Sequence, residues 1–248
     1  MNNDVHAPAQ CARAIRGFPR GVELFQEGER LAEVFQIVGG TVKLVCTGED
    51  GQESISKLGF VNDWLGIAPV IAEQPAQVSA ITCEASRIRI IGADTFRDML
   101  KSDLDFSTKI NTVLSQDLCR QSEWLRRLTT SRSGERLRRV LRDLVSALGC
   151  NDRSGAIRVK LPIQNRELAH LVAITPEHLS RLLRELDDDG VVRRDKGWMI
   201  VPDLERLCPD SRRHKRESSP IDRGLTNINN YVDINQRQSD TGWVSIRS

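Results

Sequence analysis

Three polar residues, Glu177, Ser180 and Arg181, are suited to bind a ligand together. Ser180 and Arg181 follow Glu177 by three and four positions, so the three share one face of a helix. Arginine can donate two hydrogen bonds to O6 and N7 of guanine, glutamate can accept one from a cytosine amino group, and serine can contact a base or a phosphate. A salt bridge between Glu177 and Arg181 with no ligand is the alternative interpretation. The set favours a helix that lies in the major groove of DNA.

Two short amphipathic helices joined by a tight turn would position these side chains. The first has its apolar face at Leu168, Leu171 and Val172, and the second at Leu179, Leu182, Leu183 and Leu186. Only residues 173–175 separate the two, Thr175 is suited to cap the second helix, and Pro176 stands where a missing N–H costs nothing. Residues 191–201 then indicate a hairpin. The order predicts a winged helix-turn-helix.

Other polar side chains of this segment suit contacts with DNA phosphates, which position a protein without specifying sequence. They are Gln164, Asn165, Arg166, Thr175, His178 and Arg184. We therefore expect a backbone-contacting set around the base-reading set.

The first third of the chain has the pattern of an all-β sandwich or barrel. From Phe18 to Gly92, short β-branched runs alternate with glycine-rich turn signals. The Gly39-Gly40 pair lies between two such runs, residues 34–38 and 41–45, and predicts a tight hairpin because two adjacent positive-φ residues match the twist of paired strands.

A long helix is expected to follow, because residues 94–128 contain no glycine or proline and their apolar residues return at helical spacing. The predicted stripe consists of Ile110, Leu114, Leu118, Leu125 and Leu128. Val113 and Trp124 lie off the stripe, so one face can pack on the β domain while the other meets a second copy of the helix. A helix buried within one chain is the alternative.

Polar residues 129–134 mark a hinge, and arginines gather around it. The basic residues are Arg120, Arg126, Arg127, Arg132, Arg136, Arg138, Arg139 and Arg142. Such a run indicates either a solvated helix face or a surface near phosphates. The last forty residues are polar and lack apolar periodicity, so we expect a disordered tail.

Composition excludes several classes of protein. With 39% hydrophobic and 28% charged residues and a net charge of +2, the 248-residue chain can bury a core. The N-terminus has no basic start, and the longest apolar stretch, residues 64–72, is broken by Pro69, so neither secretion nor a membrane span is expected. Six scattered cysteines without Cys-x-x-Cys argue against structural zinc and favour reduced thiols in the cytoplasm.

The order of β-roll, long helix and winged helix resembles the Crp/Fnr family of bacterial transcription regulators. The resemblance is most specific at residues 165–169 running into residues 175–183, and the β half agrees at residues 25–28 and 37–42. It implies an α+β fold with a cyclic-nucleotide-binding-like jelly roll, and a homodimer that binds two-fold DNA and contacts RNA polymerase. The Glu-x-x-Ser-Arg form is similar to the Fnr branch, whose half-site is of the TTGAT type. Ala173 departs from a common turn glycine.

The sensor half departs more from the family pattern. Cyclic-nucleotide-binding members use a Gly-Glu pair and an Arg-Ser pair; here the first reads Gly66-Ile67 and the second falls in residues 75–79, which hold no arginine. Burying a phosphate with no cationic partner is costly, so we do not expect cyclic AMP as effector. Cys11 stands alone where oxygen-sensing members hold an iron–sulfur centre, and the β domain has no histidine for haem. No cofactor is expected.

Two alternatives for the sensor stay open, namely another small ligand in the β-roll or thiol oxidation at Cys119 on the long helix. A cupin-type enzyme would need metal ligands in the β domain, and all four histidines lie outside it, so we expect no enzyme. The expected divisions are an N-terminal segment (1–17), a β-roll (18–100), a dimerisation helix (101–131), a winged helix-turn-helix (132–208) and a disordered tail (209–248).

Overall fold

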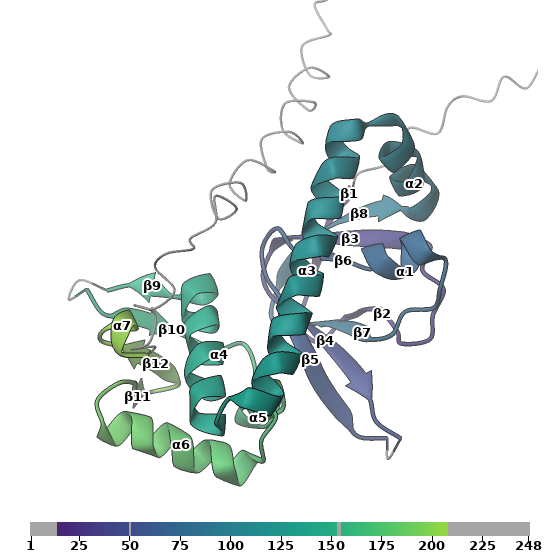
Figure 1. Ribbon diagram of the computed structural model, residues 1–248. Coiled ribbons are helices and arrows are strands. Elements are labelled where there is room, and N and C mark those ends of the chain that lie inside the picture. Colours follow the sequence, from purple (N-terminus) through teal and green to yellow (C-terminus); the bar gives the residue numbers. More distant parts are fainter. Residues whose placement is uncertain (1–13, 50, 153–154, 208–248) are drawn as a thin grey trace, which may run out of the picture. The chain divides into compact units, whose positions relative to one another are not determined.

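The computed structural model describes residues 14–49, 51–152 and 155–207. The tail expected at 209–248 and most of the N-terminal segment expected at 1–17 lie outside these ranges. The described part has the α+β fold that the sequence predicts, with a β-roll, a long helix and a winged helix-turn-helix (Figure 1). None of its helices combines the length and the apolar character that a membrane span requires.

The β-roll consists of two four-stranded antiparallel sheets. In the first, the order is β1 (Ala14–Phe18), β8 (Ser86–Gly92), β3 (Glu33–Gly39) and β6 (Trp64–Leu65). In the second, it is β2 (Glu23–Phe25), β7 (Ser79–Thr82), β4 (Val42–Thr47) and β5 (Glu53–Gly59). Buried side chains of both sheets, among them Phe35 and Ile88 from one and Val42 and Ala80 from the other, form a single cluster. The roll begins at Ala14, four residues before the expected boundary, because β1 pairs with β8.

The hairpin predicted at Gly39-Gly40 is wrong. Strand β3 pairs with β8 and β6, whereas β4 pairs with β5 and β7, so the two glycines connect different sheets. Within the pair, Gly40 alone has a positive φ, of 87°. A Cβ at Gly40 would collide with the side chain of Ser86. Glycine is therefore needed where the chain crosses from one sheet to the other at close range. The local turn signal does not distinguish such a crossing from a hairpin.

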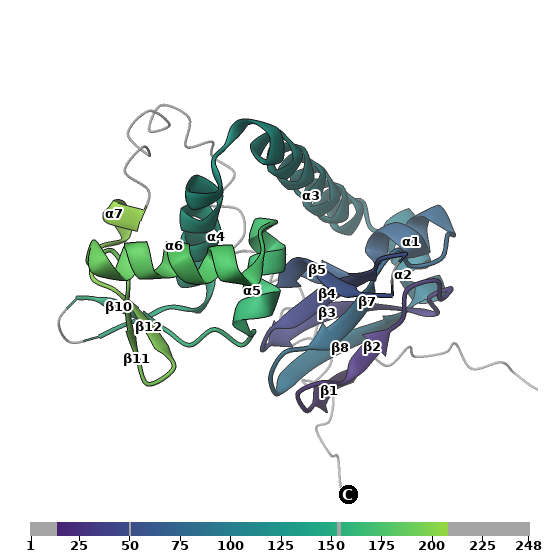
Figure 2. The same cartoon turned by 90° about the horizontal axis from the view of Figure 1, so that it is seen from below.

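Three helices follow or interrupt the roll: α1 (Ile67–Ala72), α2 (Ala93–Ser102) and α3 (Leu104–Thr130). Asp103 separates α2 from α3, and its carboxylate caps α3 by accepting from the N–H of Phe106 at 2.9 Å. Figure 2 shows α1 and α2 beside the first part of α3. There Trp64, Phe96 and Phe106 pack ring against ring, which fixes the start of α3 on the roll.

The C-terminal domain begins with α4 (Ser133–Leu148), so the break between α3 and α4 is Ser131-Arg132. It continues through β9 (Cys150–Asn151), β10 (Ile157–Val159), α5 (Asn165–Val172), α6 (Pro176–Asp188), β11 (Arg193–Asp195), β12 (Trp198–Val201) and α7 (Leu204–Leu207). The wing is the β11–β12 hairpin, whose two turn residues, Lys196 and Gly197, both have positive φ. Leucines of α4, α5 and α6 share one buried core, which fixes the three helices relative to one another.

Candidate nucleic-acid interface

Helix α6 presents the side chains that the sequence singles out for base contact. The hydroxyl of Thr175 caps the helix by accepting from the N–H of His178 at 3.2 Å, and Pro176 occupies the first helical position. The leucine face packs into the domain core. Glu177, Ser180 and Arg181 are all exposed on the other side, as is Arg184. The three predicted base contacts thus lie together on one open helix face.

The polar contacts of that face differ from the salt bridge considered for it. Within the described residues, Glu177 and Arg181 form no ion pair; instead the Nη2 of Arg181 lies 3.0 Å from Nδ1 of His178. Ser180 donates its hydroxyl to the carbonyl of Pro176 at 2.9 Å, which leaves the hydroxyl oxygen able to accept. Glu177 therefore remains exposed as an acceptor, while the guanidinium of Arg181 is bonded to His178.

The predicted phosphate contacts fall into two places. Thr175, His178 and Arg184 belong to α6 or its cap, whereas Gln164, Asn165 and Arg166 lie exposed at the start of α5. There Arg166 also reaches Gln52 of the β-roll, at 3.5 Å.

Glu167 connects the start of α5 to the β-roll. It accepts from the Gln164 N–H at 2.7 Å and from Lys43 Nζ at 2.6 Å. Burial raises the pKa of Glu167, but the hydrogen bonds from Lys43 and Gln164 outweigh that effect and hold the pKa below its usual value. The first helix of the motif is thus anchored through a charged pair as well as through its apolar face.

Arg136 ties the turn of the motif to the hinge. Its Nε donates to the carbonyl of Val172 at 3.0 Å and its Nη2 to that of Ala173 at 3.3 Å, while its Nη1 donates to the carbonyl of Ser131 at 2.8 Å. In the sequence, Arg136 stands out only as part of a basic run. The C-terminal carbonyls of α5 need donors, but nothing local identifies a residue 36 positions earlier as their source.

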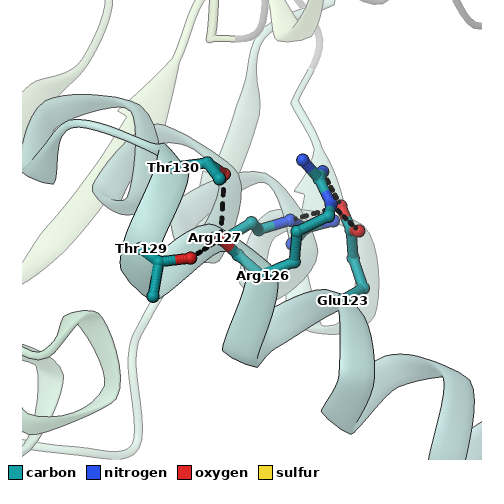
Figure 3. Close-up of polar contacts among 5 residues, drawn as sticks. All are labelled: Glu123, Arg126, Arg127, Thr129 and Thr130. Carbon is teal, nitrogen blue, oxygen red and sulfur yellow. Dashed lines mark hydrogen bonds and ion pairs between the residues drawn. The ribbon is translucent and has the colours of Figure 1, made fainter.

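The arginines before the hinge are also engaged within the fold. Figure 3 shows the side chains of Arg126 and Arg127 converging on Glu123, with nitrogen–oxygen distances of 2.7 and 2.8 Å. The hydrogen bonds from Arg126, followed by those from Arg127, lower the pKa of Glu123 to about 2. The stabilisation of the fold by these bonds to Glu123 is present above the usual carboxyl pKa and is lost as pH falls toward 2. These two arginines of the basic run therefore stabilise the C-terminal end of α3.

The predicted leucine stripe of α3 divides in two. Ile110 is only 2% exposed and packs with Trp64 and Phe96, and Leu114 lies partly buried against the same cluster. Leu118 and Leu125, in contrast, are 65% and 64% exposed, and Leu128 is 37% exposed. The prediction that the whole stripe meets a second copy is therefore wrong for Ile110, which packs within its own protomer. For Leu118, Leu125 and Leu128 it stays a prediction.

Two positions that the family resemblance singles out in the sensor half are buried and apolar in this structure. Ile67, which the resemblance implies stands in the place of a glutamate, is buried with Val34 and Val70. Ala76 lies in the core of the roll, and Ser79 uses its hydroxyl to accept from the N–H of Glu27. No group of three metal-ligating side chains occurs in the described ranges. Cys119 is exposed on α3, next to Leu118.

Comparison with known proteins gives the class. Residues 135–209 match the model of the Crp-like helix-turn-helix domain, and residues 15–103 match that of the cyclic nucleotide-binding domain. The chain belongs to the Crp/Fnr family of transcription regulators, whose members bind DNA through this helix-turn-helix and are not enzymes.

Particular relatives are distant. A CRP-like cAMP-activated global transcriptional regulator of Mycobacterium tuberculosis is 27% identical over 79% of this chain and 87% of that protein. The transcriptional activator protein FnrL of Cereibacter sphaeroides is 23% identical over 83% of each chain. Among solved structures, FixK2 from Bradyrhizobium japonicum shares the fold with a TM-score of 0.70, at 18% identity, over 78% of this chain and 94% of its own.

Replacing Ala173 by glycine is expected to stabilise the C-terminal domain by about 0.5–1 kcal/mol. Ala173 ends α5 with φ 55° and ψ 56°, a left-handed conformation that costs an L-residue about 1–2 kcal/mol, part of which the flexibility of glycine in the unfolded chain offsets. Denaturant unfolding of the full chain measures the difference. Ala169→Gly, inside the same helix, is the matched control and should destabilise; equal destabilisation at both positions would contradict the left-handed conformation.

Proposed function

We propose that this protein is a homodimeric regulator that binds a TTGAT-type palindrome in the cytoplasm, contacts RNA polymerase, and does not require cyclic AMP. The observation that carries the proposal is the exposed set Glu177, Ser180 and Arg181 on α6, opposite a face of buried leucines. In the major groove, Arg181 reads a guanine and Glu177 accepts from an amino group on the opposite strand. Ser180 touches a thymine or a phosphate once its hydroxyl hydrogen turns from the Pro176 carbonyl to the DNA.

Side chains around this face of α6 position the protein on the duplex. Gln164, Asn165, Arg166, Thr175 and Arg184 are exposed and carry donors for phosphate oxygens. Arg166 and Arg184 contribute the charge, so they set the salt dependence of binding rather than its sequence preference.

A second copy of the chain is the partner that the uncovered half of α3 fits. Leu118 and Leu125 are seven residues apart, and Leu128 follows at the next helical turn, which is the spacing of a two-stranded coiled coil. Three of the eight large apolar side chains exposed in the described residues lie on the second half of this one helix, at Leu118, Leu125 and Leu128. Such a concentration on one face supports an interface.

Independence from cyclic AMP is supported by the apolar character of the sensor. The Mycobacterium tuberculosis relative is described as cAMP-activated. In this chain, Ile67 is 4% exposed within an apolar cluster, and residues 75–79 supply no cation. A cyclic phosphate would then be buried without the charged hydrogen bonds that offset its desolvation.

The purified protein is therefore expected to bind a TTGAT-N4-ATCAA duplex with no nucleotide added. A gel-shift titration measures this, with a duplex of scrambled half-sites as the control. We expect the palindrome to bind about 10³-fold more tightly or better, the lower end of specificity ratios for DNA-binding proteins. Adding cyclic AMP should leave the midpoint unchanged. Binding that appears only with the nucleotide would overturn the proposal for the sensor, and equal binding to both duplexes would overturn the proposed site.

A further inference from the structure

His178 uses both of its ring nitrogens within the protein. Nδ1 lies 3.0 Å from Nη2 of Arg181, and Nε2 lies 2.9 Å from the hydroxyl oxygen of Ser133. A guanidinium has donors only, so Nδ1 must be the acceptor and carries no proton. The proton of the neutral ring then sits on Nε2 and is donated to Ser133. The ring is thus a bridge with one defined direction, from Arg181 to Ser133.

The far end of this bridge lies at the hinge. Ser133 is the first residue of α4, directly after the Ser131-Arg132 break that follows α3. One turn later, Arg136 binds the carbonyl of Ser131 and the carbonyl of Val172, at the end of α5. Two separate sets of hydrogen bonds therefore connect the hinge to the helix-turn-helix, and one of them ends on the guanidinium of Arg181.

We propose that His178 is a positioning residue that sets the base specificity of Arg181 and links it to the hinge, in place of the phosphate contact expected for it. This inference rests on the proposed role of Arg181 in reading a guanine. An arginine side chain loses rotamer freedom when it binds a base, and holding it beforehand removes part of that cost. The hydrogen bond to His178 is compatible with base reading. It uses one N–H of the Arg181 guanidinium, and four remain for the two bonds to guanine.

A phosphate contact by His178, the alternative role, requires a different arrangement of ring protons. A phosphate contact needs a ring N–H directed at DNA. The tautomer that satisfies both ring contacts has no proton on Nδ1 and donates the N–H of Nε2 to Ser133. A phosphate contact would also contribute equally on every sequence, since phosphates carry no sequence information. The two roles therefore separate in a measurement of discrimination rather than of affinity.

The test is a double-mutant cycle with His178→Ala and Arg181→Ala, measured on the palindrome and on a duplex changed at the base pair that Arg181 reads. The ratio of the two affinities is the readout. We expect His178→Ala to lower this ratio about twofold to tenfold, the range of a single hydrogen bond. In the Arg181→Ala chain, the same change should lower it no further, because the two residues act as one unit. A loss of affinity that is equal on both duplexes would overturn the inference in favour of a phosphate contact.

Two conservative variants separate the ends of the bridge. Asparagine at position 178 can place its carbonyl near the site of Nδ1, so His178→Asn should keep the discrimination ratio. Glutamine places its amide near the site of Nε2, so His178→Gln should lower the ratio as alanine does. A reversed order would overturn the assignment, and unfolding midpoints of all variants control for folding. If Arg181→Ala leaves the ratio of the two affinities unchanged, the proposed function fails. If Arg181→Ala abolishes the discrimination while His178→Ala leaves it unchanged, only the inference about His178 fails.

Discussion

Replacing Leu118 and Leu125 together by aspartate is expected to convert the protein into a monomer and to weaken its binding to the palindrome by about a hundredfold or more. Both side chains are largely exposed on α3, so they hold no part of the protomer's own core. In a paired helix they would meet their copies, and four carboxylates would then be desolvated side by side. A monomer binds one half-site at a time and loses the effective concentration that links the two.

Sedimentation velocity and a gel-shift titration measure the two effects on the same samples. Ile15→Asp is a suitable control, because Ile15 is also an exposed apolar residue, 46% accessible, but belongs to β1 rather than α3. It should leave both the dimer and DNA binding intact. An intact dimer in the Leu118→Asp, Leu125→Asp variant would refute this placement of the interface. Substitutions at Ile110 are a poor test, since that side chain stabilises the β-roll.

Separating the two half-sites by five additional base pairs is expected to weaken binding by a similar factor. A symmetric dimer presents its two recognition helices to one side of the duplex, about 34–36 Å apart. Half a helical turn moves one half-site to the opposite side, so only one copy of α6 can be seated at a time. The loss is again that of linked binding, on the order of 10²-fold or more.

The matched control is a five-base-pair insertion placed outside the palindrome, which changes length and charge equally but keeps the spacing. That duplex should bind like the original one. A dimer that tolerates the inner insertion would show that the two helix-turn-helix domains bind independently, which contradicts a fixed two-fold arrangement. The Leu118→Asp, Leu125→Asp variant should be insensitive to the spacing, because it already binds one half-site at a time.

The helix-turn-helix could be predicted from the sequence because its signals are local. Leucine spacing, the Thr175 cap and Pro176 at the first helical position all act within one or two turns of chain. The side chains on the exposed face of α6 follow from that periodicity alone. The wing could be predicted equally well, since Lys196-Gly197 is a two-residue turn between short strands.

The features that the sequence did not reveal depend on contacts between distant segments. The chain around Gly39-Gly40 looks like a hairpin, but which strands pair is decided by β5, β7 and β8, which come later. Ile110 belongs to the same helical stripe as Leu118, yet Trp64 of β6 and Phe96 of α2 cover it. The bond between Ser133 and His178 joins residues 45 positions apart, so no spacing rule could identify it.

Base reading by α6 is tested by the affinity of Arg181→Ala for the palindrome and for every single-base variant of one half-site. We expect a cost of about 1–3 kcal/mol on the intact palindrome and no remaining discrimination at one base pair per half-site. Arg184→Ala and Arg166→Ala, at phosphates, should instead weaken all duplexes alike and reduce the salt dependence. A uniform loss for Arg181→Ala across all variants would show that Arg181 contacts the backbone, which contradicts the assignment of α6 as the base-reading helix.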